Sequence, residues 1–202
     1  MKVLGVSSHP DDAVLGCAGA IANHVRIKDE VFLLFLTRGE EGGDPKVRVK
    51  EAIESAKVLG VPKKMLRFEN LSDTRLFENL RKTILAIERI VGIFQPDRVY
   101  TPSDKDRHQD HIAAAIATKA ACRHVPQIFA YESPSTQAEF SPQVFIDISD
   151  VLSLKSKAIR LHRSQMGKVY TKDEAVKGLA RFRGLQAGVK AAEAFEVYRI
   201  IL

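Results

Sequence analysis

The chain has 202 residues, of which 45% are hydrophobic and 28% charged, a composition typical of a soluble globular protein. No apolar run approaches the roughly 20 residues that a membrane-spanning helix requires. Because Met1 leads straight into an apolar run, the sequence leaves no room for a signal peptide, and we expect a cytoplasmic protein.

The formal net charge of +6 could indicate a polyanionic partner. The basic residues are, however, scattered over segments with helical periodicity, and acidic residues are mixed among them in the first half of the chain. This pattern favours a solvated surface, so we expect no nucleic-acid partner, although an acidic surface or an anionic small substrate stays open.

Apolar runs alternate with helix-like patterns along the first 130 residues. The runs that predict strands are, in chain order, Val3–Ser7, Val31–Thr37, Met65–Phe68, Arg98–Thr101, Gln127–Tyr131, Val144–Ile148 and Val197–Leu202. The segments that predict helices are Cys17–Ile27, Lys46–Leu59, Leu76–Phe94, His111–Arg123, Val151–His162 and Lys172–Ala192. This alternation predicts an α/β fold, a Rossmann-like and mainly parallel sheet with helices on both faces. No linker interrupts the pattern, so we expect residues 1–202 to form a single domain.

The motif His9-Pro10-Asp11-Asp12 directly follows the first predicted strand. It stands where a dinucleotide-binding sheet carries a Gly-x-Gly-x-x-Gly turn, so the sequence gives no support to nucleotide binding. In open α/β sheets, ligands bind at the carboxyl ends of the strands. An imidazole and a carboxylate there could hold a divalent metal, leaving a second carboxylate free as a base. An ordinary Pro-Asp turn is the alternative interpretation of this motif.

A second cluster, His108-Gln109-Asp110-His111, follows the predicted strand Arg98–Thr101. If the two strands are neighbours, His9, Asp12 and His111 supply two imidazoles and a carboxylate, the ligand set of a catalytic zinc site. The same set also serves non-haem iron enzymes, so Fe²⁺ is the second candidate. Surface residues at a helix start are the alternative for the second cluster.

Together the two clusters resemble the paired signatures of the LmbE-like/PIG-L family of zinc-dependent de-N-acetylases. Further family-like segments occur in a consistent order: Thr37-Arg38-Gly39-Glu40-Glu41-Gly42, Leu71-Ser72-Asp73, Gln95-Pro96-Asp97 and His162-Arg163-Ser164-Gln165. The resemblance implies a metal-dependent amidohydrolase that removes the N-acetyl group from an N-acetylglucosamine-containing small molecule.

The resemblance also implies roles for individual residues. Zn²⁺ held by His9, Asp12 and His111 would activate water, and Asp11 would act as the general base. A protonated His108, its pKa raised by a contact with Asp110, would stabilise the oxyanion. Either Asp11 or His108 would then protonate the leaving amine.

Arg48 and Asp73 match positions that bind sugar hydroxyls in the family. The alternatives are a surface ion pair between Arg48 and Glu51, and a turn-capping role for Asp73.

The sequence departs from the family at Ala13, where the family usually has Glu, and at Gln109, where Pro is frequent. The missing acid leaves open a family member that binds metal without turnover. The identity of the sugar conjugate is also open, as is the oligomeric state, with a homo-oligomer possible.

Overall fold

The computed structural model describes residues 1–201, and seven strands form one sheet in the order β3-β2-β1-β4-β5-β7-β6. The strands are β1 (Lys2–Ser7), β2 (Glu30–Phe35), β3 (Leu66–Phe68), β4 (Arg98–Pro102), β5 (Gln127–Tyr131), β6 (Val144–Asp147) and β7 (Ala192–Ile200). Strands β1 to β5 pair in parallel, and β7 pairs antiparallel with β5 and β6. The predicted mainly parallel α/β sheet is confirmed.

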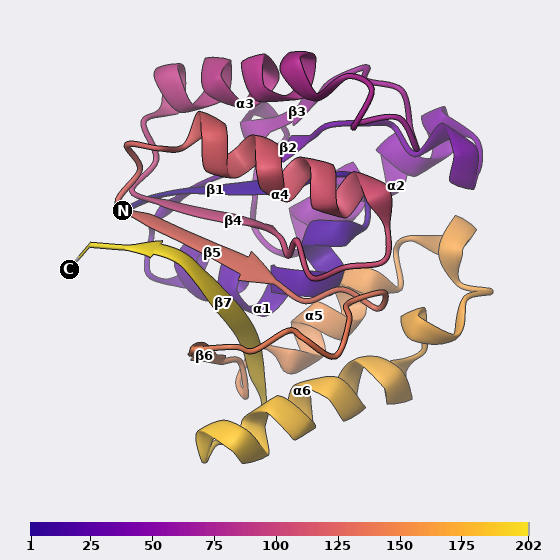
Figure 1. The fold of residues 1–202 in the computed structure, drawn as a ribbon. Coiled ribbons are helices and arrows are strands. Elements are labelled where there is room, and N and C mark those ends of the chain that lie inside the picture. The colour runs from indigo at the N-terminus through magenta and orange to yellow at the C-terminus, as the bar shows by residue number, and fades with distance from the viewer. Residues whose placement is uncertain (202) are drawn as a thin grey trace.

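Six helices cover the two faces of this sheet (Figure 1). They are α1 (Asp12–Arg26), α2 (Pro45–Val58), α3 (Leu80–Phe94), α4 (Gln109–Ala121), α5 (Leu152–Ile159) and α6 (Asp173–Ala187). Because strand side chains alternate between faces, Val3 joins the core under α1, α2, α5 and α6, whereas Leu4 and Val6 join the core under α3 and α4. In the described residues, no helix combines the length and apolar character needed to cross a bilayer.

Two of the predicted boundaries differ from the structure by five residues: α1 begins at Asp12 instead of Cys17, and the boundary between α6 and β7 is shifted. The helix predicted to reach Ala192 ends at Ala187, because Gly188 adopts a left-handed backbone conformation with φ +73° and caps it. The released residues begin β7 at Ala192, five residues before the predicted strand start at Val197. Leu202, the last residue of that predicted strand, lies outside the described residues.

The neighbouring strands β1 and β4 place the two sequence clusters side by side. Val3 pairs with Arg98 and Leu4 with Val99, while β2 extends the sheet on the other side of β1 and β5 on the other side of β4. This point, where the strand order reverses direction, is where open α/β sheets have their crevice.

Helix α1, which follows the first cluster, is broken at Cys17, whose φ of −141° is not helical. The break leaves backbone groups without their helical hydrogen bonds, and two side chains from the C-terminal third form hydrogen bonds with these groups. The Glu193 carboxylate accepts hydrogen bonds from the N–H groups of Gly19 and Ala20, both at 2.8 Å. Lys155 donates to Glu193 and to a carbonyl oxygen ahead of the break, both at 2.7 Å. The buried ion pair therefore completes the hydrogen bonding of the broken helix.

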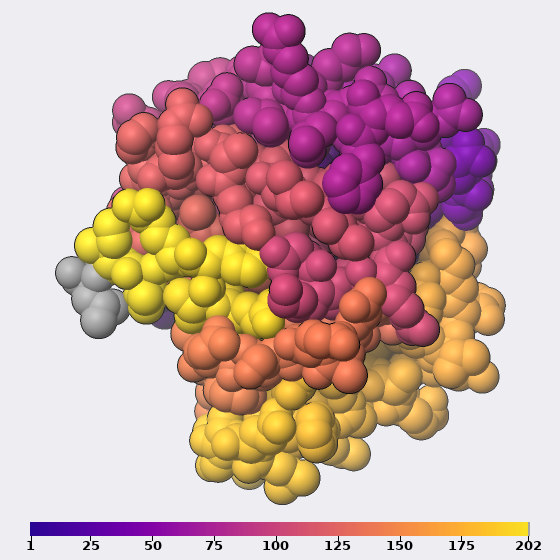
Figure 2. Space-filling model, in the orientation of Figure 1, coloured from indigo at the N-terminus to yellow at the C-terminus, as the bar shows by residue number. Residues whose placement is uncertain are grey.

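The C-terminal third packs closely against the sheet. In the space-filling view (Figure 2), the gold segment that contains α6 lies directly against the orange segment that contains β6.

Candidate metal centre and active site

A cavity of about 360 Å³ opens at the carboxyl ends of β1 and β4. Of the residues that the sequence singled out, those that line it are His9, Asp11, Asp12, Arg48, Asp73, His108 and His111. Asp110 is fully buried behind the cavity wall. Residues from four separate segments of the chain thus converge on one site.

The Asp12 carboxylate lies between two imidazoles. Its Oδ2 is 3.1 Å from Nδ1 of His9, and its Oδ1 is 3.3 Å from Nε2 of His111. All three side chains are buried, and one donor atom from each lies within 4.8 Å of the others. Two imidazoles and one carboxylate are a ligand set that zinc or iron accepts, so these residues fit a divalent metal.

The second nitrogen of each imidazole is held by other carboxylates. Nε2 of His9 lies 2.9 Å from Asp73 and 3.3 Å from Asp110, and Nδ1 of His111 lies 3.0 Å from Asp106. Metal-binding histidines usually donate their far N–H to such an acceptor, which fixes the ring and raises its basicity. Each ring is therefore oriented with its other nitrogen toward Asp12.

The acidic surroundings also control the charge of the two imidazoles. Burial alone would lower the pKa of His9, but the charge of Asp12, with hydrogen bonds from His9 to the neighbouring carboxylates, raises it well above its usual value. The same balance between burial and the charge of Asp12 raises the pKa of His111 to about 9. The site thus strongly favours positive charge at its centre.

Asp106 is a residue of this site that the sequence did not reveal. Besides His111, its carboxylate accepts hydrogen bonds from the hydroxyls of Ser133 and Ser135, and from the backbone N–H of His108 at 2.8 Å. Burial would raise the pKa of Asp106, but the contact with His111 and the serine hydroxyls hold it well below its usual range. It lies in a polar loop without a motif, and its two serine partners come from the loop after β5.

Asp11 pairs with Arg48 in the wall of the cavity. Nη2 of Arg48 donates to Oδ1 of Asp11 at 2.5 Å, and Nη1 donates to the Gly39 carbonyl at 3.0 Å. Arg48 is buried, so it does not form a surface ion pair with Glu51. A Cβ atom at Gly42 would lie 2.3 Å from Nη1 of Arg48, so any other residue there would displace this guanidinium.

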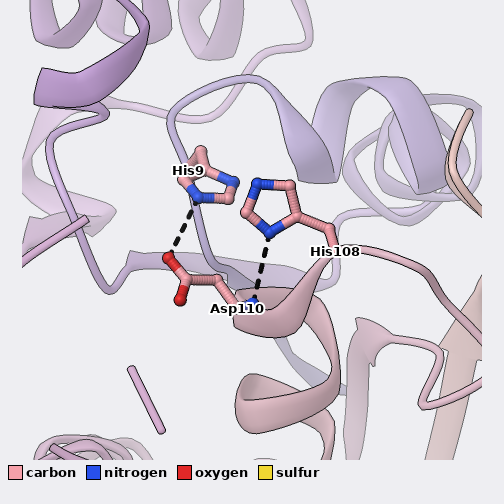
Figure 3. A group of neighbouring side chains, drawn as sticks. All are labelled: His9, His108 and Asp110. Carbon is pink, nitrogen blue, oxygen red and sulfur yellow. Dashed lines mark hydrogen bonds and ion pairs between the residues drawn. The ribbon is translucent and has the colours of Figure 1, made fainter. Parts of the chain in front are cut away.

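The expected contact between the Asp110 carboxylate and the His108 ring is not present among the described residues. That carboxylate instead accepts from the N–H groups of Thr74, at 2.7 Å, and Leu76, at 3.1 Å, and lies near His9. Only the backbone N–H of Asp110 reaches His108, at Nδ1, as Figure 3 shows. Since His108 begins α4 as its N-cap, its ring folds back over the helix start.

The expectation of a raised pKa at His108 is also contradicted. Burial lowers the pKa of His108, and the positive charges of His9 and His111 lower it further. Because Nδ1 accepts the hydrogen bond from the helix start, a neutral ring carries its proton on Nε2. His108 can therefore donate a hydrogen bond without being a cation.

Asp73 has the turn-capping role, which is one of the two uses that the sequence left open. Its Oδ1 accepts from the N–H of Thr74 at 2.9 Å, as a turn cap does, and also contacts His9. Its Oδ2 accepts from the N–H of Glu41 at 3.0 Å. Sugar binding by Asp73 stays a prediction, since its oxygens already have these partners.

Ala13, which replaces an acid common in the resembled family, is buried beside a void of about 10 Å³. The void is also lined by Ser55 and His162. Neither the Ser55 hydroxyl nor either ring nitrogen of His162 has a partner among the described residues. Burial lowers the pKa of His162. The missing carboxylate is therefore accompanied by unpaired polar atoms close behind the first turn of α1.

The fold and the site define an α/β enzyme with a candidate divalent-metal centre at the carboxyl edge of its sheet. Residues 4–122 match the family model PIG-L, described as GlcNAc-PI de-N-acetylase. The chain belongs to this family, and it is an amidohydrolase of the deacetylase class.

Two individual relatives are deacetylases, in agreement with this assignment, and a third is named for a different reaction. The chain is 36% identical to an uncharacterized deacetylase, YaiS, of Escherichia coli, over 80% of this chain and 90% of that protein. It superposes on the N,N'-diacetylchitobiose deacetylase of Pyrococcus horikoshii with a TM-score of 0.83 and 28% identity, covering 97% of this chain and 83% of that one. The 4-oxalmesaconate hydratase of Pseudomonas putida is also similar, with 27% identity over 92% of this chain and 81% of that protein.

Proposed function

We propose that this protein hydrolyses the N-acetyl group of an N-acetylglucosamine-containing small molecule, with Zn²⁺ bound by His9, Asp12 and His111. The observation that carries the proposal is the orientation of the two imidazoles. Both present one nitrogen to Asp12 while carboxylates hold the other. Fe²⁺ is the alternative metal, because it accepts the same ligands.

The metal, when bound, supplies a Lewis acid that polarises the amide carbonyl and makes water more acidic. Asp11 lines the cavity but lies outside the ligand set, so its carboxylate is available to take a proton from the attacking water. Arg48 fixes the position of this carboxylate through its hydrogen bond to Oδ1. Asp11 is therefore the proposed general base.

His108 is the proposed hydrogen-bond donor to the developing oxyanion. Its Nδ1 is occupied by the helix start, which leaves the N–H of Nε2 to donate. Because its pKa is lowered, we assign delivery of the proton to the leaving amine to Asp11, which acquires one in the first step. One carboxylate then serves as base and afterwards as acid.

The size of the cavity supports a small-molecule substrate. A volume of about 360 Å³ is in the range of small-ligand sites, and exposed Arg107 and Lys168 stand at its rim. Asp73 and Arg48 are the proposed contacts for sugar hydroxyls. One similar structure is a diacetylchitobiose deacetylase, and the family model is described as GlcNAc-PI de-N-acetylase. Both descriptions support an amino-sugar conjugate as the substrate.

Acetate release from a panel of N-acetylglucosamine conjugates tests the proposal. Removing the metal with a chelator should abolish release, and adding back Zn²⁺ or Fe²⁺ should show which metal restores it. A metal-loaded protein that releases no acetate from any member of the panel would contradict the deacetylase proposal and favour a family member without this turnover.

A further inference from the structure

A second cavity, of about 380 Å³, adjoins the metal centre. It lies between α1, α6 and β7, and its apolar walls include Leu15, Val169, Val176, Leu179, Ala180 and Ala194. Leu15, Pro134 and Tyr170 line both cavities. A ligand at the metal centre therefore borders directly on this apolar space.

The charged residues of the second cavity are already paired with protein groups. Lys155 and Glu193 form the ion pair at the break in α1. Glu132 accepts two hydrogen bonds from Arg183, at 2.8 and 2.7 Å. A charged ligand would find no free counter-charge there and would lose its hydration, whereas an uncharged apolar group would lose only contact with water.

We propose that the substrate is amphipathic and that an uncharged alkyl or aryl group of the amino-sugar conjugate occupies this second cavity. This inference rests on the proposed deacetylase function and deepens it. The polar sugar lies at the metal centre, and the apolar group passes Leu15 and Tyr170 into the space beside α6. The group is either the aglycone or an extension of the N-acyl chain, since both provide the same chemistry.

Two substrate series distinguish these sources. One series varies the alkyl aglycone of an N-acetylglucosaminide from methyl to hexyl, and the other varies the N-acyl chain of a methyl glucosaminide from acetyl to octanoyl. Burial of one methylene is worth a factor of about four. We therefore expect kcat/KM to rise by up to about fourfold per methylene in one series until the cavity is full. A flat or falling response in both series would overturn the inference.

Variants on α6 test whether the preference for longer apolar groups arises in the second cavity. Leu179, which lines the cavity, is 42% exposed, so Leu179→Glu should fold while placing a charge at the cavity mouth. The exposed Ala175 also lines it, and Ala175→Phe should fill the space. In the series that responds, both variants should lower the ratio of kcat/KM for the longest over the shortest substrate at least tenfold. Leu185→Glu, on the same helix at a residue 81% exposed and outside the cavity, is the matched control and should keep the ratio.

Binding without turnover separates this inference from the proposed function. Hexyl β-glucoside has no acetamide. If the aglycone series responds, calorimetry should show that it binds the metal-loaded enzyme more tightly than methyl β-glucoside, with the difference lost in Leu179→Glu. Such binding in a protein that releases no acetate would refute the deacetylase proposal alone. Turnover without any preference for the longer apolar group in either substrate series, together with equal binding of the two glucosides, would refute the second cavity as a subsite.

Discussion

Arg48 and Asp11, which are far apart in sequence, meet at 2.5 Å in the buried wall of the metal cavity. Besides its proposed contact with sugar hydroxyls, Arg48 donates through Nη2 to the carboxylate that we propose as general base. Arg48→Gln should therefore leave Asp11 misplaced and lower kcat about 100-fold, the usual effect of displacing a reacting group by about 1 Å. Metal content should not change. The exposed Lys50 on the same helix provides the control Lys50→Gln, and an equal loss in that variant would contradict the positioning role.

The division of labour between adjacent carboxylates can be tested directly. Asp11→Asn should keep the metal but lose 100- to 10,000-fold in activity, because only the proton acceptor is removed. His111→Ala should lose the metal, since it removes one of three ligands. Metal analysis after desalting, together with acetate release, gives both readouts. Full metal retention in a His9→Ala/His111→Ala double variant would refute the ligand assignment.

Asp106 should contribute to metal affinity, although it is not a proposed ligand and contacts His111 only at Nδ1. Asp106→Asn weakens the acceptor for Nδ1 of His111 and should reduce metal affinity 10- to 100-fold, as loss of such an acceptor does in other metal sites. Competition with a chromogenic chelator measures this affinity. Asp104→Asn, two residues earlier and bonded to Lys119 instead, should leave the affinity unchanged.

His162 should make the protein sensitive to mild acid. The unfolded chain takes up a proton at this residue near pH 6.5, whereas burial lowers the folded-state pKa. Stability is therefore lost as the pH falls from about 6.5 toward the folded-state pKa. His162→Leu removes the titration and two unpaired buried nitrogens, so the difference in Tm between pH 8 and pH 5 should narrow. The same substitution at exposed His124 should have a smaller effect on this difference.

The sequence predicted which clusters meet, because carboxyl ends of parallel strands share an edge and His9 and His111 follow neighbouring strands. The sequence could not predict which hydrogen-bond donors each carboxylate contacts. Asp110 turns from His108 toward the N–H groups of Thr74 and Leu76, and that choice depends on a loop that returns from a distant part of the chain. Asp106 was not predicted as a site residue, because nothing in its local sequence distinguishes it from a polar loop residue.

The boundary between α6 and β7 was misplaced because Ala-rich sequence has helical periodicity, whereas the left-handed Gly188 and strand pairing decide the outcome. The burial of Arg48 was also unforeseen. It depends on glycines of another segment that leave space for the guanidinium, and sequence spacing on the helix carries no information about them.

Because of the break in α1, an N-terminal fragment of this protein should not bind metal by itself. Every proposed metal ligand lies within the first 111 residues, yet the turn that carries Asp12 joins the rest of its helix through hydrogen bonds completed by Lys155 and Glu193. A fragment that ends after α4 would contain all the ligands but not these two partners. We expect it to bind metal only when the missing polypeptide is supplied as a second piece, so the ligand-bearing segment is not an independent, transferable module.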